Sequence, residues 1–262
     1  MTAPIPRDLP DLPALPGTAS SLLPSPVPAT AVVPRVRRPL AAAYRMLTAV
    51  AALTAVTITL LRGSPARVLS DFAVQSTLFL ALVLLMSARR AWSARHPLPG
   101  SLAGAALLYT LLAFLVHHTL LADAAPAYAP TADATHPAPW PTSAADLVIH
   151  TVVPLAALLD WLLLSPPGRM RLRQTAPWLL YPLVYLIFVL ARGELLPGTP
   201  ARYLYPFLDV DQHGYRGVLG NALLLGLALY ALAVLLVALD HARPNPVRRR
   251  RETGFRLQPP VG

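Results

Sequence analysis

"GVLGNALLLGLALYALAVLLVAL", residues 217–239, decides the fold of this chain. The stretch carries no charged side chain, and it is longer than the roughly 20 residues that an α-helix needs to cross the hydrocarbon layer of a bilayer. A helix that is apolar on every side is typical of a membrane span or of a deeply buried core helix. Further stretches of the same kind would make the protein a membrane-embedded bundle.

Five such segments precede it, at residues 40–61, 68–87, 100–121, 145–164 and 176–193. Apolar residues make up 55% of the chain and charged residues 13%, and the mean hydropathy is +0.52. A water-soluble core could not bury so many apolar side chains. The sequence therefore predicts an all-α polytopic membrane protein, a six-transmembrane-helix bundle. It shows no internal repeat of the kind that marks an inverted-repeat transporter.

The distribution of arginine predicts the topology, because lysine is absent and the net charge is +10. Arginines gather before the first segment, between the second and third, between the fourth and fifth, and after the sixth. The connection between the third and fourth segments has none, and carries Asp123 and Asp133 instead. Since arginine excess marks the cytoplasmic side, we expect both the N and C termini in the cytoplasm. The arginine-rich, lysine-free composition suits a bacterium with a GC-rich genome, so the expected location is the bacterial plasma membrane.

The ends of the chain differ in composition from its middle. Residues 1–38 are rich in proline, which predicts a disordered cytoplasmic tail. Residues 39–240 form the predicted transmembrane domain, and residues 241–262 a basic cytoplasmic tail. The arginines at 248–251 are expected to fix topology and to attract anionic lipid headgroups, not nucleic acid. Membrane lipids are thus the expected partners, and the sequence gives no oligomeric state.

The predicted topology gathers polar residues in the outer half of the bundle. Ionisable groups at membrane depth face the bundle interior or water, so an outward-facing polar cavity is expected. Its expected members are Ser70, Asp71, Gln75, Ser76, Thr77, His117, His118, Thr119, Asp146, His150, Arg192, Glu194 and Asn221. The chain has no cysteine, which excludes thiolate metal sites, and no cofactor or metal is predicted.

His150 is the main candidate within this set. It lies a turn inside the fourth segment, where a neutral imidazole can act as a general base or a ligand, or can simply make a structural hydrogen bond. Asp146 precedes it by four residues and is within reach of the imidazole on a helix. The alternative for Asp146 is helix capping, because it follows Ser143 by three residues. His117 and His118 end the third segment, where cations suit the helix dipole.

Three stretches carry a resemblance to a known family: "HTVVPLAAL" (150–158), "YPLVYLIFVLARGELL" (181–196) and "RYLYPFLDV" (202–210). Together they resemble the Pr6Pr-type bacterial membrane proteins, and more distantly the androgen-induced and androgen-dependent membrane proteins of animals. The resemblance covers roughly residues 40–240. It implies a multi-pass fold and, from the animal members, hydrolysis of fatty acid esters of hydroxy fatty acids by a threonine nucleophile and a histidine, which would be His150.

The family's second-helix pattern corresponds here to "FAVQST", residues 72–77. Phe72, Gln75 and Ser76 match the pattern, while Ala73 stands where the family has the threonine and Thr77 where it has an asparagine. A hydroxyl near a base is needed for nucleophilic attack. Ser76 is therefore the predicted nucleophile, and Ser70 the second choice on the same predicted helix face.

Three functions follow from these observations. The first is a lipid-binding or regulatory multi-pass membrane protein. The second is an intramembrane lipid-ester hydrolase with Ser76, His150 and Asp146 as catalytic residues. The third is a b-type haem protein with His118 and His150 as ligands. The tyrosines of "RYLYPF" are expected in an interfacial aromatic belt, and Pro182 is expected to kink the fifth helix.

Overall fold

The computed structural model describes residues 36–121, 140–197 and 202–244. Within these ranges every regular element is a helix, and six helical segments are long and apolar enough to cross a membrane. They are Pro39–Arg62, Phe72–Trp92, Gly100–Leu120, Ala144–Leu164, Leu172–Leu195 and Val210–Ala242. The predicted all-α bundle of a multi-pass membrane protein is confirmed. The predicted tails lie almost entirely outside the described residues.

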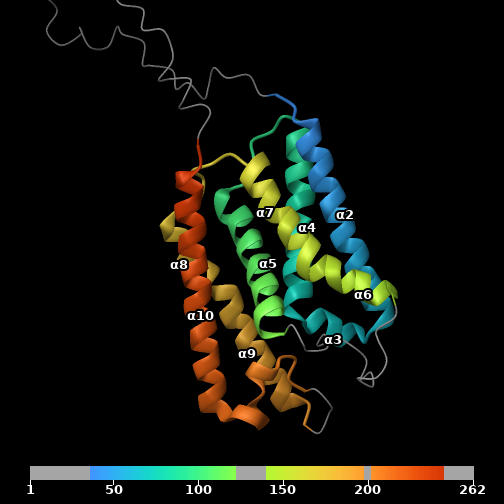
Figure 1. The fold of residues 1–262 in the computed structure, drawn as a ribbon, viewed down its shortest axis with the longest axis vertical. Coiled ribbons are helices and arrows are strands. Elements are labelled where there is room, and N and C mark those ends of the chain that lie inside the picture. Colours follow the sequence, from blue (N-terminus) through green and yellow to red (C-terminus); the bar gives the residue numbers. More distant parts are fainter. Residues whose placement is uncertain (1–35, 122–139, 198–201, 245–262) are drawn as a thin grey trace, which may run out of the picture. The chain divides into compact units, whose positions relative to one another are not determined.

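The elements in chain order are α2 (Pro39–Arg62), α3 (Pro65–Ser70), α4 (Phe72–Trp92), α5 (Gly100–Leu120), α6 (Trp140–Leu147), η1 (Val148–Val152), α7 (Val153–Leu159), η2 (Asp160–Leu164), η3 (Leu172–Gln174), α8 (Thr175–Trp178), α9 (Leu180–Leu195), η4 (Pro206–Leu208) and α10 (Val210–Ala242). α2 packs along α4, and α4 packs along α5 (Figure 1). The fourth span, α6 to η2, contacts α2 and α5, and α10 contacts α5 and α8.

The first described helix begins, and the last one ends, at the same end of the bundle (Figure 1). There the Arg38 N–H donates to the Ala91 carbonyl at 3.1 Å, and the Gly168 N–H donates to the Asp240 carbonyl at 3.0 Å. The arginine-rich connections therefore meet at one end, as an even number of crossings requires. Which side of a membrane this end faces stays a prediction.

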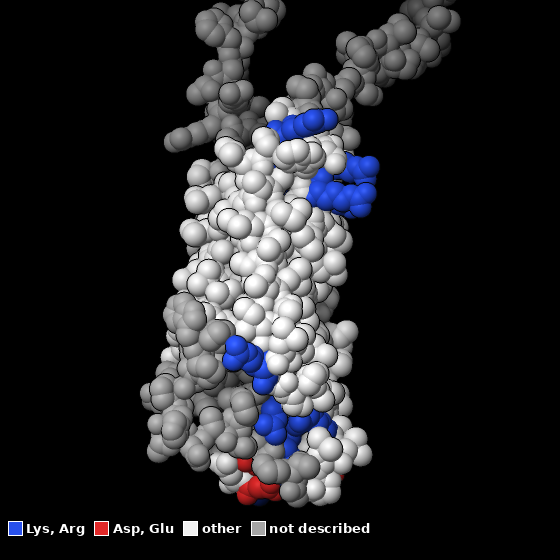
Figure 2. All heavy atoms as spheres, turned by 90° about the vertical axis from the view of Figure 1, so that its right-hand side faces the viewer, with Lys and Arg blue, Asp and Glu red and all other residues white. Residues whose placement is uncertain are grey.

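The surface of the bundle is apolar between its ends. On the face drawn in Figure 2, basic side chains lie toward both ends, acidic side chains lie at the lower end, and the band between shows neither kind. Large apolar side chains such as Leu47, Leu163 and Leu224 are exposed. Exposed apolar area on this scale is explained by contact with lipid tails.

The second predicted segment is two helices, not one. α3 ends at Ser70, the backbone of Asp71 is extended, and the Asp71 carboxylate accepts from the Val74 N–H at 3.1 Å, which caps α4. The expectation that Ser70 and Ser76 share one helix face is therefore wrong, because they belong to different helices.

Prolines interrupt two of the spans. In the fourth, Pro154 cannot donate a hydrogen bond to the His150 carbonyl and its ring crowds that group, and the preceding turn widens into the π-helix η1. In the fifth, Pro182 frees the Trp178 carbonyl, which accepts instead from the Tyr109 hydroxyl at 2.9 Å. The expected interruption of the fifth helix lies at Leu179, one turn before this proline.

Candidate functional site

A cavity of about 690 Å³ lies among α4, α5, α9 and α10. Apolar side chains form most of its wall, including Leu112, Val116, Leu183, Leu186 and Ala222. The side chains with polar atoms that line it are His117, His150, Tyr185, Tyr205 and Tyr230. The expected polar cavity is thus corrected: the cavity is apolar, with imidazoles on its wall. Its volume lies in the range of small-molecule sites, roughly 300–1,000 Å³.

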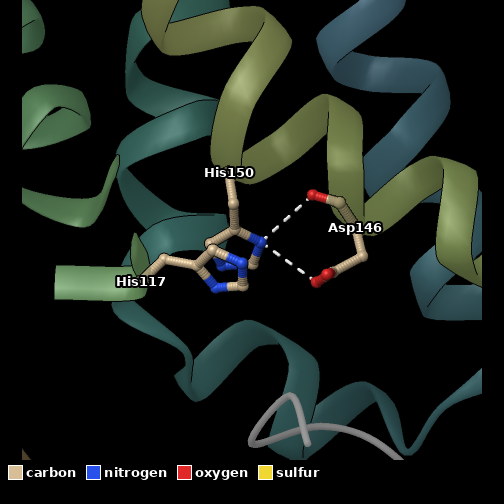
Figure 3. A group of neighbouring side chains, drawn as sticks. All are labelled: His117, Asp146 and His150. Carbon is tan, nitrogen blue, oxygen red and sulfur yellow. Dashed lines mark hydrogen bonds and ion pairs between the residues drawn. The ribbon is translucent and has the colours of Figure 1, made fainter. Parts of the chain in front are cut away.

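His150 reaches the cavity wall from the π-helix η1 and is only 6% exposed. Its Nδ1 lies 3.0 Å from the Asp146 carboxylate Oδ1 and 3.2 Å from the Asp146 carbonyl oxygen (Figure 3). Two acceptors on one nitrogen assign the proton to Nδ1, so Nε2 of a neutral ring is left as the basic atom. α6 begins at Trp140, which places Asp146 beyond the first turn. The geometry therefore favours the orienting role of Asp146 over capping.

His117, from the last turn of α5, lies against His150. The two ring centroids are 4.1 Å apart and the ring planes differ by 19°, so the imidazoles are stacked (Figure 3). One ligand atom from each of His117, Asp146 and His150 lies within 4.8 Å of the others. We call these three residues the His-Asp-His cluster. The sequence places His117 and Asp146 at the ends of neighbouring helices, but it does not show that these helices turn His117 toward His150.

His118 lies edge-on to His117, with ring centroids 5.0 Å apart, and directs its nitrogen away from the cluster. Its Nε2 lies 3.0 Å from the Thr151 hydroxyl, and its ring packs on Phe114. Because His150 stacks on His117, the two histidines expected as haem ligands have separate partners. The haem alternative stays a prediction, and no distance in the described residues favours it.

Ser76 is fully buried, and its hydroxyl donates to the carbonyls of Phe72 at 2.8 Å and Ala73 at 3.1 Å. Ser76 is not part of the cavity wall, whereas Ala73 is. Ser70 donates to the Ala66 carbonyl of its own helix. The role of Ser76 as a nucleophile therefore stays a prediction, and its hydroxyl would have to leave both carbonyls to meet a ligand.

A second buried network adjoins the cavity. The Tyr205 hydroxyl donates to Asp71 Oδ2 at 3.1 Å and accepts from the Phe72 N–H at 3.2 Å. Burial raises the pKa of the Asp71 carboxyl above its ordinary value, while the nearby His150 and the hydrogen bonds act in the opposite direction. Tyr205 is 7% exposed, so its expected place in an interfacial aromatic belt is wrong. The sequence gives no signal of this contact, because Tyr205 and Asp71 are 134 residues apart in the chain.

Three of the other polar residues expected at the cavity hold the segment between α9 and α10. Arg192 donates to the Arg202 carbonyl at 2.6 Å, and Glu194 accepts from the Tyr215 hydroxyl at 2.7 Å. Asn221 donates to the Phe207 carbonyl at 2.9 Å. These side chains stabilise local structure and are not part of the cavity wall.

The fold and the cavity define a six-span helical membrane protein with an apolar chamber and imidazoles on its wall. Comparisons with protein-family models, curated proteins and solved structures find no match for this chain. The function is accordingly argued from the site itself.

Proposed function

We propose that this protein binds a single-chain amphiphilic lipid, of the fatty acid or fatty ester class, in the apolar cavity. The observation that carries the proposal is the contrast inside one chamber, where aliphatic walls meet the imidazoles of His117 and His150. An acyl chain would fill the apolar part and release water from it. A carboxylate or ester oxygen at the imidazoles would accept an N–H hydrogen bond from His117, because the N–H of His150 is directed at Asp146.

The walls of the cavity suggest entry from the bilayer. The fifth and sixth spans, which supply much of the wall, are each only 22% buried, compared with 56% for the second span. Two spans with few neighbours can separate more easily than tightly packed ones. A lipid would therefore reach the cavity between α9 and α10 without crossing water.

Filling the cavity tests the proposal. Gly226 is part of the cavity wall, and a Cβ atom added there meets no other atom within 4 Å, so Gly226→Phe adds a ring at the cavity wall without a backbone clash. Gly220 on the same helix has the same open surroundings and is not part of the wall, which makes Gly220→Phe the matched control.

Binding of a fluorescent long-chain fatty acid to the purified protein in nanodiscs is the measurement. We expect Gly226→Phe to weaken binding by at least about tenfold, or roughly 1.4 kcal/mol, while Gly220→Phe binds as the parent protein does. Equal binding by both variants and the parent would contradict the proposal.

A second candidate is the lipid-ester hydrolase that the family resemblance implies. The observation that favours it is the Asp146–His150 pair, which leaves His150 Nε2 as a potential general base. Ala73 at the cavity wall supplies no hydroxyl, so the attacking group would be Ser76 or a water molecule.

Turnover of a fatty acid ester of a hydroxy fatty acid distinguishes hydrolysis from binding alone. We expect a hydrolase to lose at least about a hundredfold in rate on His150→Ala, and His118→Ala to keep its rate. A serine-hydrolase probe that labels the parent protein and not Ser76→Ala would assign the nucleophile to Ser76. If no turnover is measured, or if His150→Ala does not reduce it, the hydrolase candidate is contradicted and lipid binding remains the proposed function.

A further inference from the structure

We propose that the His-Asp-His cluster binds a divalent transition-metal ion of the zinc type beside the apolar cavity. The proposal goes beyond lipid binding and does not depend on it. It joins residues of two spans, His117 from α5 with Asp146 and His150 from the fourth span.

The spacing along the fourth span suits two ligands of one ion. Asp146 and His150 are four residues apart, which places both side chains on one helix face. Metal–nitrogen and metal–oxygen bonds of about 2.0–2.2 Å set the ligand atoms of a tetrahedral zinc site roughly 3.3 Å apart. His150 Nδ1 and Asp146 Oδ1 are 3.0 Å apart. These two atoms therefore already lie close to a zinc-binding separation, and the ion would replace the proton that Nδ1 directs at Asp146, with the neutral ring carrying its proton on Nε2 instead.

His117 supplies the third ligand after a side-chain rotation. Stacked rings direct their nitrogen lone pairs along nearly parallel lines, so one imidazole must turn before both can meet one ion. His117 is the ring that can turn, because it is partly exposed at the end of α5 and makes no hydrogen bond outside the cluster to any residue that the structure describes. His150, in contrast, is 6% exposed. Metal binding is thus expected to separate the stacked rings.

The donor set selects the class of ion. Imidazole nitrogen with a carboxylate oxygen suits Zn²⁺, Ni²⁺ and Cu²⁺, and it suits Ca²⁺ and Mg²⁺ poorly, since these ions prefer oxygen ligands alone. Three protein ligands leave a fourth position of a tetrahedral ion open, as in sites where zinc binds water or substrate. His117 and His150 both reach the cavity, so the open position would lie next to it.

Calorimetric titration of the purified full chain with Zn²⁺ tests the site. The protein is purified without a histidine tag and dialysed against a chelator, and Co²⁺ serves as a spectroscopic substitute whose visible absorption reports a tetrahedral site. We expect one Zn²⁺ per chain. His117→Ala, Asp146→Asn and His150→Ala are each expected to weaken binding by at least about tenfold, as loss of a metal-coordinating group does.

His118→Ala is the matched control. It removes the neighbouring histidine, whose Nε2 lies beside Thr151 and outside the cluster. Each variant's melting temperature without metal shows whether it is folded, and Asp146→Asn keeps the side-chain volume if an alanine variant is unstable. Absence of stoichiometric binding, or equal weakening by His118→Ala, overturns the site. Fatty acid binding measured in chelator is a separate result, so the lipid proposal and the metal proposal can fail independently.

Discussion

At the residue scale, the charged groups of the bundle fall into two kinds. At the arginine-rich end, Arg45 Nε pairs with Asp160 Oδ1 at 2.7 Å, and both side chains are nearly buried. Asp240, 1% exposed, accepts from the backbone N–H groups of Arg169 and Met170. These carboxylates are satisfied within the protein. The His-Asp-His cluster differs, because two of its members reach a cavity large enough for a ligand.

Breaking the buried ion pair should destabilise the bundle strongly. Arg45→Met leaves the Asp160 carboxylate buried without its cation, and such a loss costs about 3–5 kcal/mol. The double variant Arg45→Met, Asp160→Leu removes both charges and should recover most of this loss. Unfolding free energy in mixed micelles with increasing SDS is the measurement, with the exposed Arg62→Met as control. A double variant as unstable as the single one would contradict this role.

Asp71 gives a pH dependence with a definite sign. Burial raises the pKa of its carboxyl above the ordinary value of 3.8. The folded state then holds the proton more tightly than the unfolded state, so the stabilisation is present at acid pH and is lost as pH rises through the folded pKa. The stability of the parent protein relative to Asp71→Asn should therefore fall as the pH rises above the ordinary carboxyl pKa of 3.8. If the stability of the parent protein relative to Asp71→Asn instead increased with pH, the folded state would favour the ionised carboxylate of Asp71 over its protonated form.

Some residues could be assigned from the sequence and others could not. The Asp146–His150 pair followed from helical spacing, which is local. The stacking of His117 on His150, and the hydrogen bond from Tyr205 to Asp71, depend on how separate helices are rotated and packed. Nothing in a single sequence reports that rotation.

At the element scale, the π-helix η1 determines the position of His150. A regular α-helix would shift every residue after the bulge by about 100° around the axis relative to those before it. The bulge could not be read from the sequence, although Pro154, which explains it, is plainly there. A proline inside a span permits a kink, a break or a π-turn, and the packing against α2 and α5 decides among them.

Pro154→Ala tests the dependence on this element. Alanine can donate to the His150 carbonyl, so we expect a more regular helix in which His150 no longer meets Asp146 in the same geometry. Zinc binding should weaken by at least about tenfold while the helical circular dichroism stays unchanged. Pro65→Ala is the control, because Pro65 begins α3, where proline replaces no helical hydrogen bond. Unchanged zinc binding in Pro154→Ala would show that the metal site does not depend on the π-helix η1.

At the scale of the whole molecule, the number of spans was predictable because a bilayer allows few solutions. Backbone groups in lipid must bond within their own helix, so long apolar stretches in the sequence become helices in the structure. The cavity was not predictable in the same way. It is the space left between α4, α5, α9 and α10, and it depends on side chains far apart in the chain. Polar residues suggested a polar chamber, but most of them bond to nearby backbone instead.

The topology can be measured directly because the chain contains no cysteine. Ser93 follows α4 at the arginine-rich end, and Gln212 lies in the first turns of α10 at the other end; both are exposed. We expect Ser93→Cys to react with a membrane-impermeant maleimide only after cell lysis, and Gln212→Cys to react in intact cells. Reaction of both from the same compartment would contradict the six-span arrangement.

The central claim, that the cavity holds an acyl chain, is tested most directly by photo-crosslinking with a fatty acid that carries a diazirine in its chain. Mapping of the crosslinked peptides should place adducts on partly buried cavity residues such as Leu112, Leu186 and Ala222. An excess of unlabelled fatty acid should suppress these adducts and leave those on lipid-facing Leu224. Adducts confined to the lipid-facing surface, or equally resistant to competition at every position, would contradict the claim.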